Sequence, residues 1–119
     1  MEKITWSELE EEEVTPQMHR KMVWGKEIMM SRMRFKDGFV VPLHHHHNEQ
    51  LSTIFKGTMR IWLGAAKEEV FDIGAGESII IPGDVPHEAL MIGEVEAMDI
   101  WSPPRQDWIE GTDDYLKQG

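Results

Sequence analysis

Four consecutive histidines, His44 to His47, are the residues of this chain with the clearest chemical potential. Imidazole nitrogens are common transition-metal ligands, so a dense group of them indicates either a metal site or an affinity tag. A tag would lie at a terminus and would need no partners elsewhere. This run is internal, is followed at once by Asn48-Glu49-Gln50, and has a distant companion in His87 beyond a proline-bounded turn. We therefore interpret it as a metal site.

Alternation along a β-strand divides the histidine run into two pairs. Successive side chains point to opposite faces, so His44 and His46 share one face and the other two histidines point away from it. Gln50 has the same parity as the first pair, whereas Glu49 does not. With His87, these residues predict a site of three imidazoles and one amide oxygen for a single divalent transition metal ion (Ni, Mn, Fe or Zn) with open positions. The alternative is that Glu49 is the fourth ligand.

The elements that must position these residues are short β-strands separated by turn signals. Such even spacing is typical of an all-β sandwich or barrel. No repeat or linker interrupts the pattern, so we expect one domain over residues 1–119, with an acidic, solvated segment at 1–15 and an extension at 103–119 that has no strand pattern. The predicted strands are 22–25, 28–35, 40–46, 52–56, 58–63, 69–73, 78–81, 87–91 and 96–101.

Composition narrows the class of protein. The net charge of −10 argues against a nucleic-acid partner, which would need clustered Lys and Arg. The absence of cysteine excludes disulfides and thiolate ligands. No apolar stretch is long enough to span a membrane, and the acidic residues at 1–13 do not resemble a signal peptide. We therefore expect a cytoplasmic protein without membrane or nucleic-acid partners.

Two motifs carry a family resemblance. The pattern G-x5-H-x-H-x3-Q-x6-G spans residues 38–57, and G-x5-P-x-D-x2-H begins the second motif, at 76–91. Together they resemble the two motifs of the cupin superfamily. That resemblance implies a double-stranded β-helix (jelly-roll) barrel, usually a homodimer, with a metal ion in its lumen.

Two positions depart from the usual cupin pattern. Asp84 replaces a turn glycine, which is a mild change because Asp tolerates such turns. Gln50 stands where the usual cupin ligand is Glu. A neutral amide leaves the charge of the metal uncompensated, so the site should be a stronger Lewis acid and should favour an anionic ligand.

A second constellation follows the last predicted strand. Asp99 and Trp101 share a strand face, and the diproline at 103–104 fixes where Arg105 begins. This stretch resembles the C-terminal segment of the pectin-degradation cupins, which ketonise 4,5-unsaturated uronates. The resemblance implies that Asp99, Trp101 and Arg105 line the pocket beside the metal, with a tryptophan where a member of that family has phenylalanine.

These residue types suit a small anionic substrate derived from a sugar. Arg105 could clamp a carboxylate, Asp99 could act as acid and base, and Trp101 could offer a face to a sugar ring. The sequence thus favours a metal-dependent uronate-ketonising enzyme of the isomerase type. A cupin dioxygenase and a non-catalytic sugar- or metal-binding module are the alternatives. The trio could also be structural, with Asp99 in a turn, Trp101 in the core and Arg105 paired with a surface acid.

Overall fold

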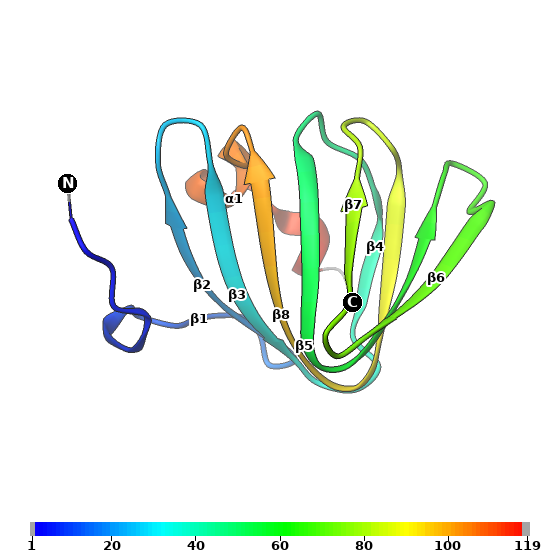
Figure 1. The fold of residues 1–119 in the computed structure, drawn as a ribbon, viewed down its shortest axis with the longest axis horizontal. Helices are drawn as coiled ribbons and strands as arrows, with labels where there is room; N and C mark the ends of the chain where they lie inside the picture. The colour runs from blue at the N-terminus through cyan, green and yellow to red at the C-terminus, as the bar shows by residue number, and fades with distance from the viewer. Residues whose placement is uncertain (1, 118–119) are drawn as a thin grey trace.

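Antiparallel strands follow one another along the chain in the computed structural model, which describes residues 2–117 (Figure 1). The eight strands are β1 (Glu12–Thr15), β2 (Met18–Trp24), β3 (Met29–Phe35), β4 (Val40–His44), β5 (Glu49–Leu63), β6 (Glu69–Gly74), β7 (Ser78–Ile81) and β8 (His87–Ser102). The helical turns are η1 (Trp6–Glu8), α1 (Gln106–Glu110) and η2 (Asp114–Lys117). None of the helices within residues 2–117 is long and apolar enough to cross a membrane.

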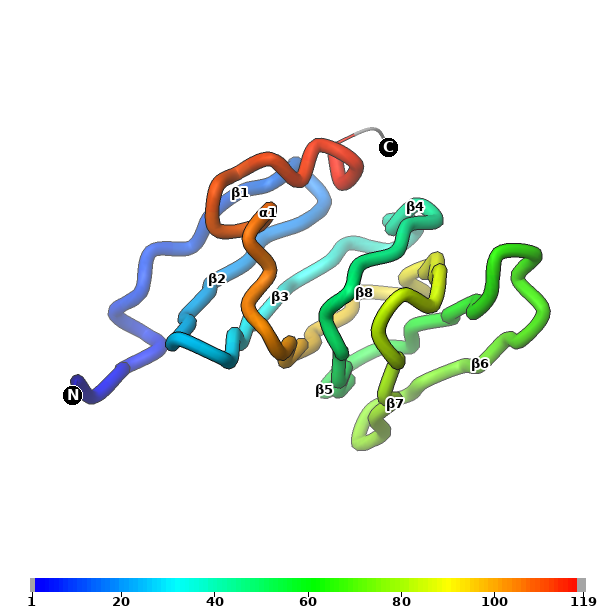
Figure 2. The backbone as a smooth tube through the Cα atoms, turned by 90° about the horizontal axis from the view of Figure 1, so that it is seen from above, coloured from blue at the N-terminus to red at the C-terminus, as the bar shows by residue number. Residues whose placement is uncertain are grey.

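The sheet folds into two walls because its two longest strands bend. The order is β1-β2-β3-β8-β5-β6, with β4 paired to β8 and β7 paired to β5. In Figure 1 the strands β5 and β8 curve through the bottom of the molecule, and each contributes to both walls. Figure 2 shows the same strands from above, and buried side chains fill the barrel interior between them. The predicted all-β jelly roll is confirmed.

The sequence wrongly predicted β5 and β8 as two strands each. Gly57 lies inside β5 with φ of +79°, at a register shift, and a Cβ there would approach the carbonyl oxygen of Glu94 to 2.3 Å. Glycine is therefore required for a bend and a close strand contact rather than for a chain reversal. The turn signal at residues 92–94 likewise lies within β8.

The core lies on the inward face of the strands. Side chains alternate along β5, where Met59 and Ile61 are buried while Arg60 and Trp62 are partly exposed. Methionines supply much of the interior, because an unbranched, polarisable side chain fills irregular space between curved walls. The buried ones are Met18, Met29, Met33, Met59 and Met91.

Both terminal segments are more ordered than the sequence indicated. The acidic segment includes β1, and its glutamates Glu11 and Glu12 bond Arg34 and Arg20. The extension after residue 102 forms α1 and η2, which bury Trp108 and Leu116. Because η2 contacts both β1 and β4, residues 103–117 close the barrel on the side shown behind the strands in Figure 1. We call residues 103–117 the C-terminal segment; residues 118–119 of the predicted extension lie outside the described part of the chain.

Candidate metal centre and the adjoining pocket

Three histidines from separate parts of the chain converge at the barrel mouth. His44 ends β4, His46 lies in the following loop, and His87 begins β8 directly opposite His44 in the register. One ligand nitrogen from each lies within 4.8 Å of the others. Ring centroids are 4.2 Å apart for His44 and His87, and 5.0 Å for His46 and His87. This cluster is a candidate site for a divalent metal ion.

Backbone hydrogen bonds orient all three imidazole rings in the same way. Each Nδ1 lies 2.8 to 3.0 Å from a backbone carbonyl oxygen, to which it donates. A neutral imidazole that donates through Nδ1 carries its lone pair on Nε2. The Nε2 atoms are thus the available metal donors. The accepting carbonyls belong to Pro42, Asn48 and Val85.

Burial keeps these histidines uncharged at neutral pH. It is the largest cause that lowers the pKa of His44 to about 3 and the pKa of His46 to about 4. Burial also lowers the pKa of His87, and the Arg105 charge acts in the same direction on all three. Neutral imidazoles are the form that binds a metal ion.

The Gln50 side chain is held in one orientation by acceptors at its amide nitrogen and a donor at its amide oxygen. Its amide nitrogen donates to Asp99 Oδ2 at 3.2 Å and to Ser52 Oγ at 2.9 Å, and its Oε1 accepts from Trp101 Nε1 at 2.8 Å. An indole N–H can only donate, and an ionised carboxylate can only accept. A flipped amide would place its oxygen against the Asp99 carboxylate and its N–H groups against the Trp101 N–H. The amide oxygen must therefore face Trp101 and the histidines.

The donor set fits a cation. His46 Nε2 and Gln50 Oε1 lie 3.1 Å apart, and both present lone pairs when the imidazole is neutral. His87 Nε2 is buried without a hydrogen-bond partner among residues 2–117. A positive ion between these atoms removes both unfavourable features. Glu49 is exposed, whereas Gln50 is buried, so the geometry favours Gln50 as the fourth donor.

The loop that carries His46 is anchored from two directions. The backbone N–H of Asp84 donates to the His46 carbonyl at 2.8 Å, and Gly83 packs so closely that a Cβ would lie 2.5 Å from the His47 carbonyl oxygen. Asp84 has φ of +66°, in the left-handed region expected for its turn. On the other side Asn48 Nδ2 donates to the carbonyl of Pro103 at 2.6 Å.

Asp99 lies beside the metal donors and is partly buried. Burial raises its pKa to about 6, while a hydrogen bond from Ser52 and the Arg105 charge oppose the shift. A carboxyl group in this range exchanges protons readily near neutral pH. The structure thus places Asp99 on the strand face that the sequence predicted, where it can act on a bound ligand.

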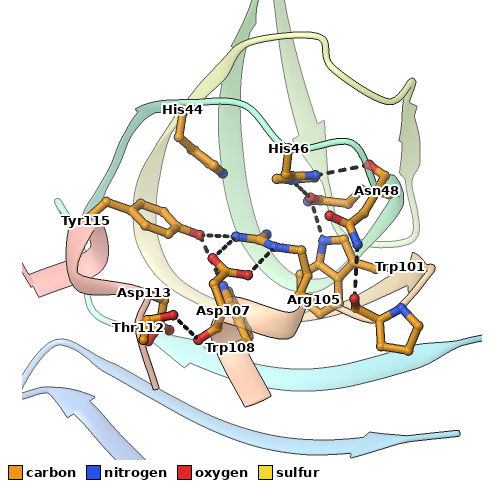
Figure 3. A network of polar contacts seen from close by, with 12 residues as sticks. His44, His46, Asn48, Trp101, Arg105, Asp107, Trp108, Thr112, Asp113 and Tyr115 are labelled. Carbon is orange, nitrogen blue, oxygen red and sulfur yellow. Dashed lines mark hydrogen bonds and ion pairs between the residues drawn. The ribbon is translucent and has the colours of Figure 1, made fainter. Parts of the chain in front are cut away.

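Arg105 lies in the same pocket, but its guanidinium is already engaged (Figure 3). Nε and Nη2 bond the two carboxylate oxygens of Asp107 at 3.0 and 2.8 Å, and Nη2 also donates to the Tyr115 hydroxyl at 2.9 Å. The paired N–H groups of Arg105, which the sequence analysis assigned to a substrate carboxylate, therefore already bond Asp107. Only Nη1 lacks an acceptor in residues 2–117.

Trp101 is in the core and borders the small inner cavity but not the outer groove. It is 1% exposed, packs with Trp108 at 4.7 Å between ring centroids, and bonds Gln50. It therefore positions the amide oxygen and supports the Arg105 guanidinium, whose carbon lies 5.7 Å from its ring. The predicted sugar-stacking face is not available in this arrangement.

Two spaces adjoin the cluster and share some of their lining residues. An inner cavity of about 50 Å³ is bordered by His44, Gln50, His87, Asp99 and apolar side chains. An outer groove of about 410 Å³ is bordered by the histidine run, Arg105 and Tyr115. Small-molecule sites usually occupy about 300 to 1,000 Å³. A sugar ring would thus fit the outer groove, with only a small part of it in the inner cavity.

Several residues of the site were missed from the sequence. Asn48 shares the parity of the predicted ligands, and that signal could have identified it. Asp107, Trp108 and Tyr115 lie in the C-terminal segment, which has no strand periodicity, so nothing in the sequence placed them. The histidines excluded by parity, His45 and His47, are exposed.

The cupin domain profile matches residues 31–101, which is more than half of the 119-residue chain. The chain therefore belongs to the cupin family. No curated protein matches it significantly. The family match confirms the predicted cupin resemblance, and the solved structure of KdgF described next has the same fold.

Solved cupin structures superpose on most of the chain. KdgF from a Halomonas species gives a TM-score of 0.77 at 23% identity, covering 86% of this chain and 94% of that one. An RmlC-like cupin from Shewanella frigidimarina NCIMB 400 gives 0.80 at 24% identity, covering 88% and 93%. Oxalate decarboxylase from Bacillus subtilis, which has Mn(II) centres, gives 0.72 at 18%, covering 84% of this chain but 29% of that one.

Proposed function

We propose that this cupin is a metal-dependent enzyme that ketonises 4,5-unsaturated uronates. One observation carries the proposal. Asp99, whose pKa is raised to about 6, bonds the Gln50 amide whose oxygen faces the three histidines, so an acid/base group adjoins the metal donors. The likeness to KdgF, in fold, supports it.

We assign His44, His46, His87 and Gln50 as the ligands of one divalent transition metal ion. Four neutral donors leave the ion with its full positive charge. When bound, the metal would stabilise negative charge that develops on a neighbouring oxygen. Manganese is one candidate, because oxalate decarboxylase has Mn(II) centres in the same fold.

Asp99 is assigned the proton transfers. Conversion of an enol to a ketone removes a proton from a hydroxyl oxygen and adds one to carbon, so one carboxyl group can accept the first and return it. The reaction is an isomerisation with no net gain or loss of atoms, electrons or protons. It needs no oxidant.

Arg105 is assigned to the substrate carboxylate. Its guanidinium is almost completely buried, and three aromatic rings surround it, which favours an anionic ligand in the outer groove. The bond to Asp107 fixes the guanidinium in place, and the free Nη1 is the part that can bind the ligand.

The test is an assay of the metal-loaded protein with unsaturated galacturonate or mannuronate released by a lyase. We expect faster loss of the enol absorbance than in buffer, and a decrease of about 10²- to 10⁴-fold in the rate for Asp99→Asn. Asp72→Asn, at an exposed site, is the matched control. An unchanged wild-type rate relative to buffer would contradict the proposal, and activity that disappears without oxygen would favour a dioxygenase.

A further inference from the structure

Tyr115 is a residue of the C-terminal segment that contacts the histidine cluster. Its ring stacks on His44 with centroids 4.6 Å apart and an interplanar angle of 28°. It borders both the inner cavity and the outer groove. In Figure 3 its hydroxyl lies at the Arg105 guanidinium, on the side of the pocket that faces the histidine rings.

The hydroxyl of Tyr115 has an unused proton. Arg105 Nη2 donates to this oxygen at 2.9 Å, and Trp108 Nε1 donates to it at 3.1 Å. Guanidinium and indole N–H groups have no acceptor capacity, so the phenol oxygen must accept both bonds. Its two lone pairs are then engaged, and its own O–H has no acceptor within residues 2–117.

The Arg105 guanidinium beside this hydroxyl also has N–H groups without an acceptor in residues 2–117. Arg105 Nη2 donates its two N–H groups to Asp107 and Tyr115, and Nε donates its single N–H to Asp107. The N–H groups of Nη1 have no acceptor in the described chain. The Tyr115 O–H and the N–H groups of Arg105 Nη1 are therefore unpaired on two residues that border the outer groove, and both kinds of donor can bond an oxygen that carries negative charge.

We infer that Tyr115 is a substrate-binding residue, and that its O–H and Arg105 Nη1 together hold the carboxylate of a sugar acid. This inference rests on the proposed function and deepens it, because the family resemblance assigned the acid to arginine alone. Asp107 already bonds Nε and Nη2 of Arg105, so Nη1 is left for one oxygen of the substrate carboxylate, and Tyr115 binds the second oxygen.

The chain contains a single tyrosine, so its hydroxyl can be observed directly. Zinc-loaded protein with ¹³C at tyrosine Cζ gives one resonance. We expect that resonance to shift and saturate on addition of galacturonate, and to stay in place with galacturonamide, whose neutral amide replaces the acid. An unmoved resonance while calorimetry shows galacturonate binding would overturn the inference.

The Tyr115→Phe variant separates binding from structure. It keeps the ring on His44, but it also leaves two donors without their acceptor, which should affect all ligands alike. We expect galacturonate to bind about 10- to 100-fold more weakly, because a hydrogen bond to a charged group is lost, and galacturonamide to be affected much less. An equal loss for both ligands would show that the role is structural and would overturn the inference.

The two proposals fail in different ways. If the wild-type protein neither binds galacturonate nor converts the unsaturated uronate, the proposed function is wrong and the carboxylate clamp is overturned with it. If the wild type converts the uronate while Tyr115→Phe keeps the KM and the preference for the acid, only the assignment of Tyr115 is overturned.

Discussion

At the scale of single residues, the amide of Gln50 satisfies two neighbours that no carboxylate could satisfy together. It accepts from Trp101 and donates to Asp99. A glutamate at this position would lose the donor and would place a second negative charge about as close to Asp99 as the amide nitrogen now lies, at 3.2 Å. Like charges at such a distance disfavour ionisation of one of the pair.

We therefore expect Gln50→Glu to bind the metal at least as tightly as the wild type and to lose most of the ketonisation activity. The added charge attracts the cation, while the repulsion raises the pKa of Asp99, so that more of this carboxyl is already protonated and cannot take a proton from the substrate. Chelator competition measures the first effect, and the enol assay measures the second. Wild-type activity in this variant would show that the Gln50–Asp99 bond is not needed.

The choice of fourth ligand is tested by a pair of alanine variants. Gln50→Ala removes a donor that faces the cluster, so we expect metal affinity to fall about tenfold or more. Glu49→Ala changes an exposed side chain and should leave the affinity unchanged. Metal release by the Glu49 change alone would reverse the assignment.

The candidate ligands could be predicted from the sequence because strand parity selects them. The alternation of exposed and less exposed side chains continues from His44 to Gln50, although β4 ends at His44. The engagement of Arg105 could not be predicted in the same way. Its partners Asp107 and Tyr115 reach it through a turn of helix and a chain reversal, which have no periodic signal.

At the scale of elements, the C-terminal segment is fastened to β2 by a buried ion pair. Arg20 donates to Asp113, and both side chains are almost fully buried. The Arg20 guanidinium also lies over the Trp108 ring, 4.3 Å from its centroid. The segment that supplies Arg105 and Tyr115 is thus held against the barrel wall.

Removing Asp113 leaves the buried Arg20 guanidinium with the part-exposed Glu12 as its only ion-pair partner among residues 2–117. We expect Asp113→Ala to lower the free energy of unfolding by about 1.5–3 kcal/mol, because a buried hydrogen bond to a charged group is lost. The exposed neighbour Asp114 provides the control, since Asp114→Ala should change it by less than about 0.5 kcal/mol. Urea denaturation measures both. Equal stability of the two variants would show that the ion pair does not fasten the segment.

The fold class could be predicted because short apolar runs and turn residues mark the strands. The continuity of β5 and β8 could not, because a glycine inside a bent strand and a glycine in a turn give the same local signal. Gly57 is distinguished only by its contact with Glu94, which is distant in sequence.

At the scale of the whole molecule, the buried histidines make the metal-free protein sensitive to acid. In the unfolded chain a histidine binds a proton below a pKa of about 6.5, whereas His44 and His46 remain neutral down to about 3 and 4. The unfolded state therefore binds more protons between these values. Their contribution to stability is complete above about pH 7 and is lost as the pH falls toward 4.

We expect the urea midpoint of the chelator-treated protein to fall steadily from pH 7 to pH 5. Asp99 acts in the opposite direction, because its raised pKa lets the folded state take up a proton near pH 6, but one carboxyl does not offset the histidines. A midpoint that stays constant over this range would contradict the lowered histidine pKa values.

An apolar row crosses the outer face of the sheet and supports the homodimer that the family resemblance implies. Residues paired in register across β7, β5, β8, β3 and β2 form this row. Ile80 is 60% exposed, and the other members of the row are partly exposed. Such a row is costly to leave in water. Its members are Ile80, Leu51, Ile100, Met30 and Val23.

We expect sedimentation velocity to show a dimer for the wild type and a monomer for Ile80→Asp. Val70→Asp is the control, because Val70 is comparably exposed, at 51%, but lies on β6, outside the row. A monomeric wild type, or dissociation by both changes, would argue against this face as the interface.

The candidate metal donors all lie within residues 44–87, whereas the groups assigned to the substrate lie within residues 99–115. Side-chain hydrogen bonds connect the two sets: Gln50 bonds Asp99 and Trp101, and Asn48 bonds the backbone carbonyls of residues 103 and 104. None of these bonds uses a side chain beyond residue 101. Mutation can therefore explore new substrates in the last part of the gene without disturbing the residues that capture the ion. A library confined to codons 104–117, with Asp113 kept, should yield many variants that retain metal and differ in the acid they bind.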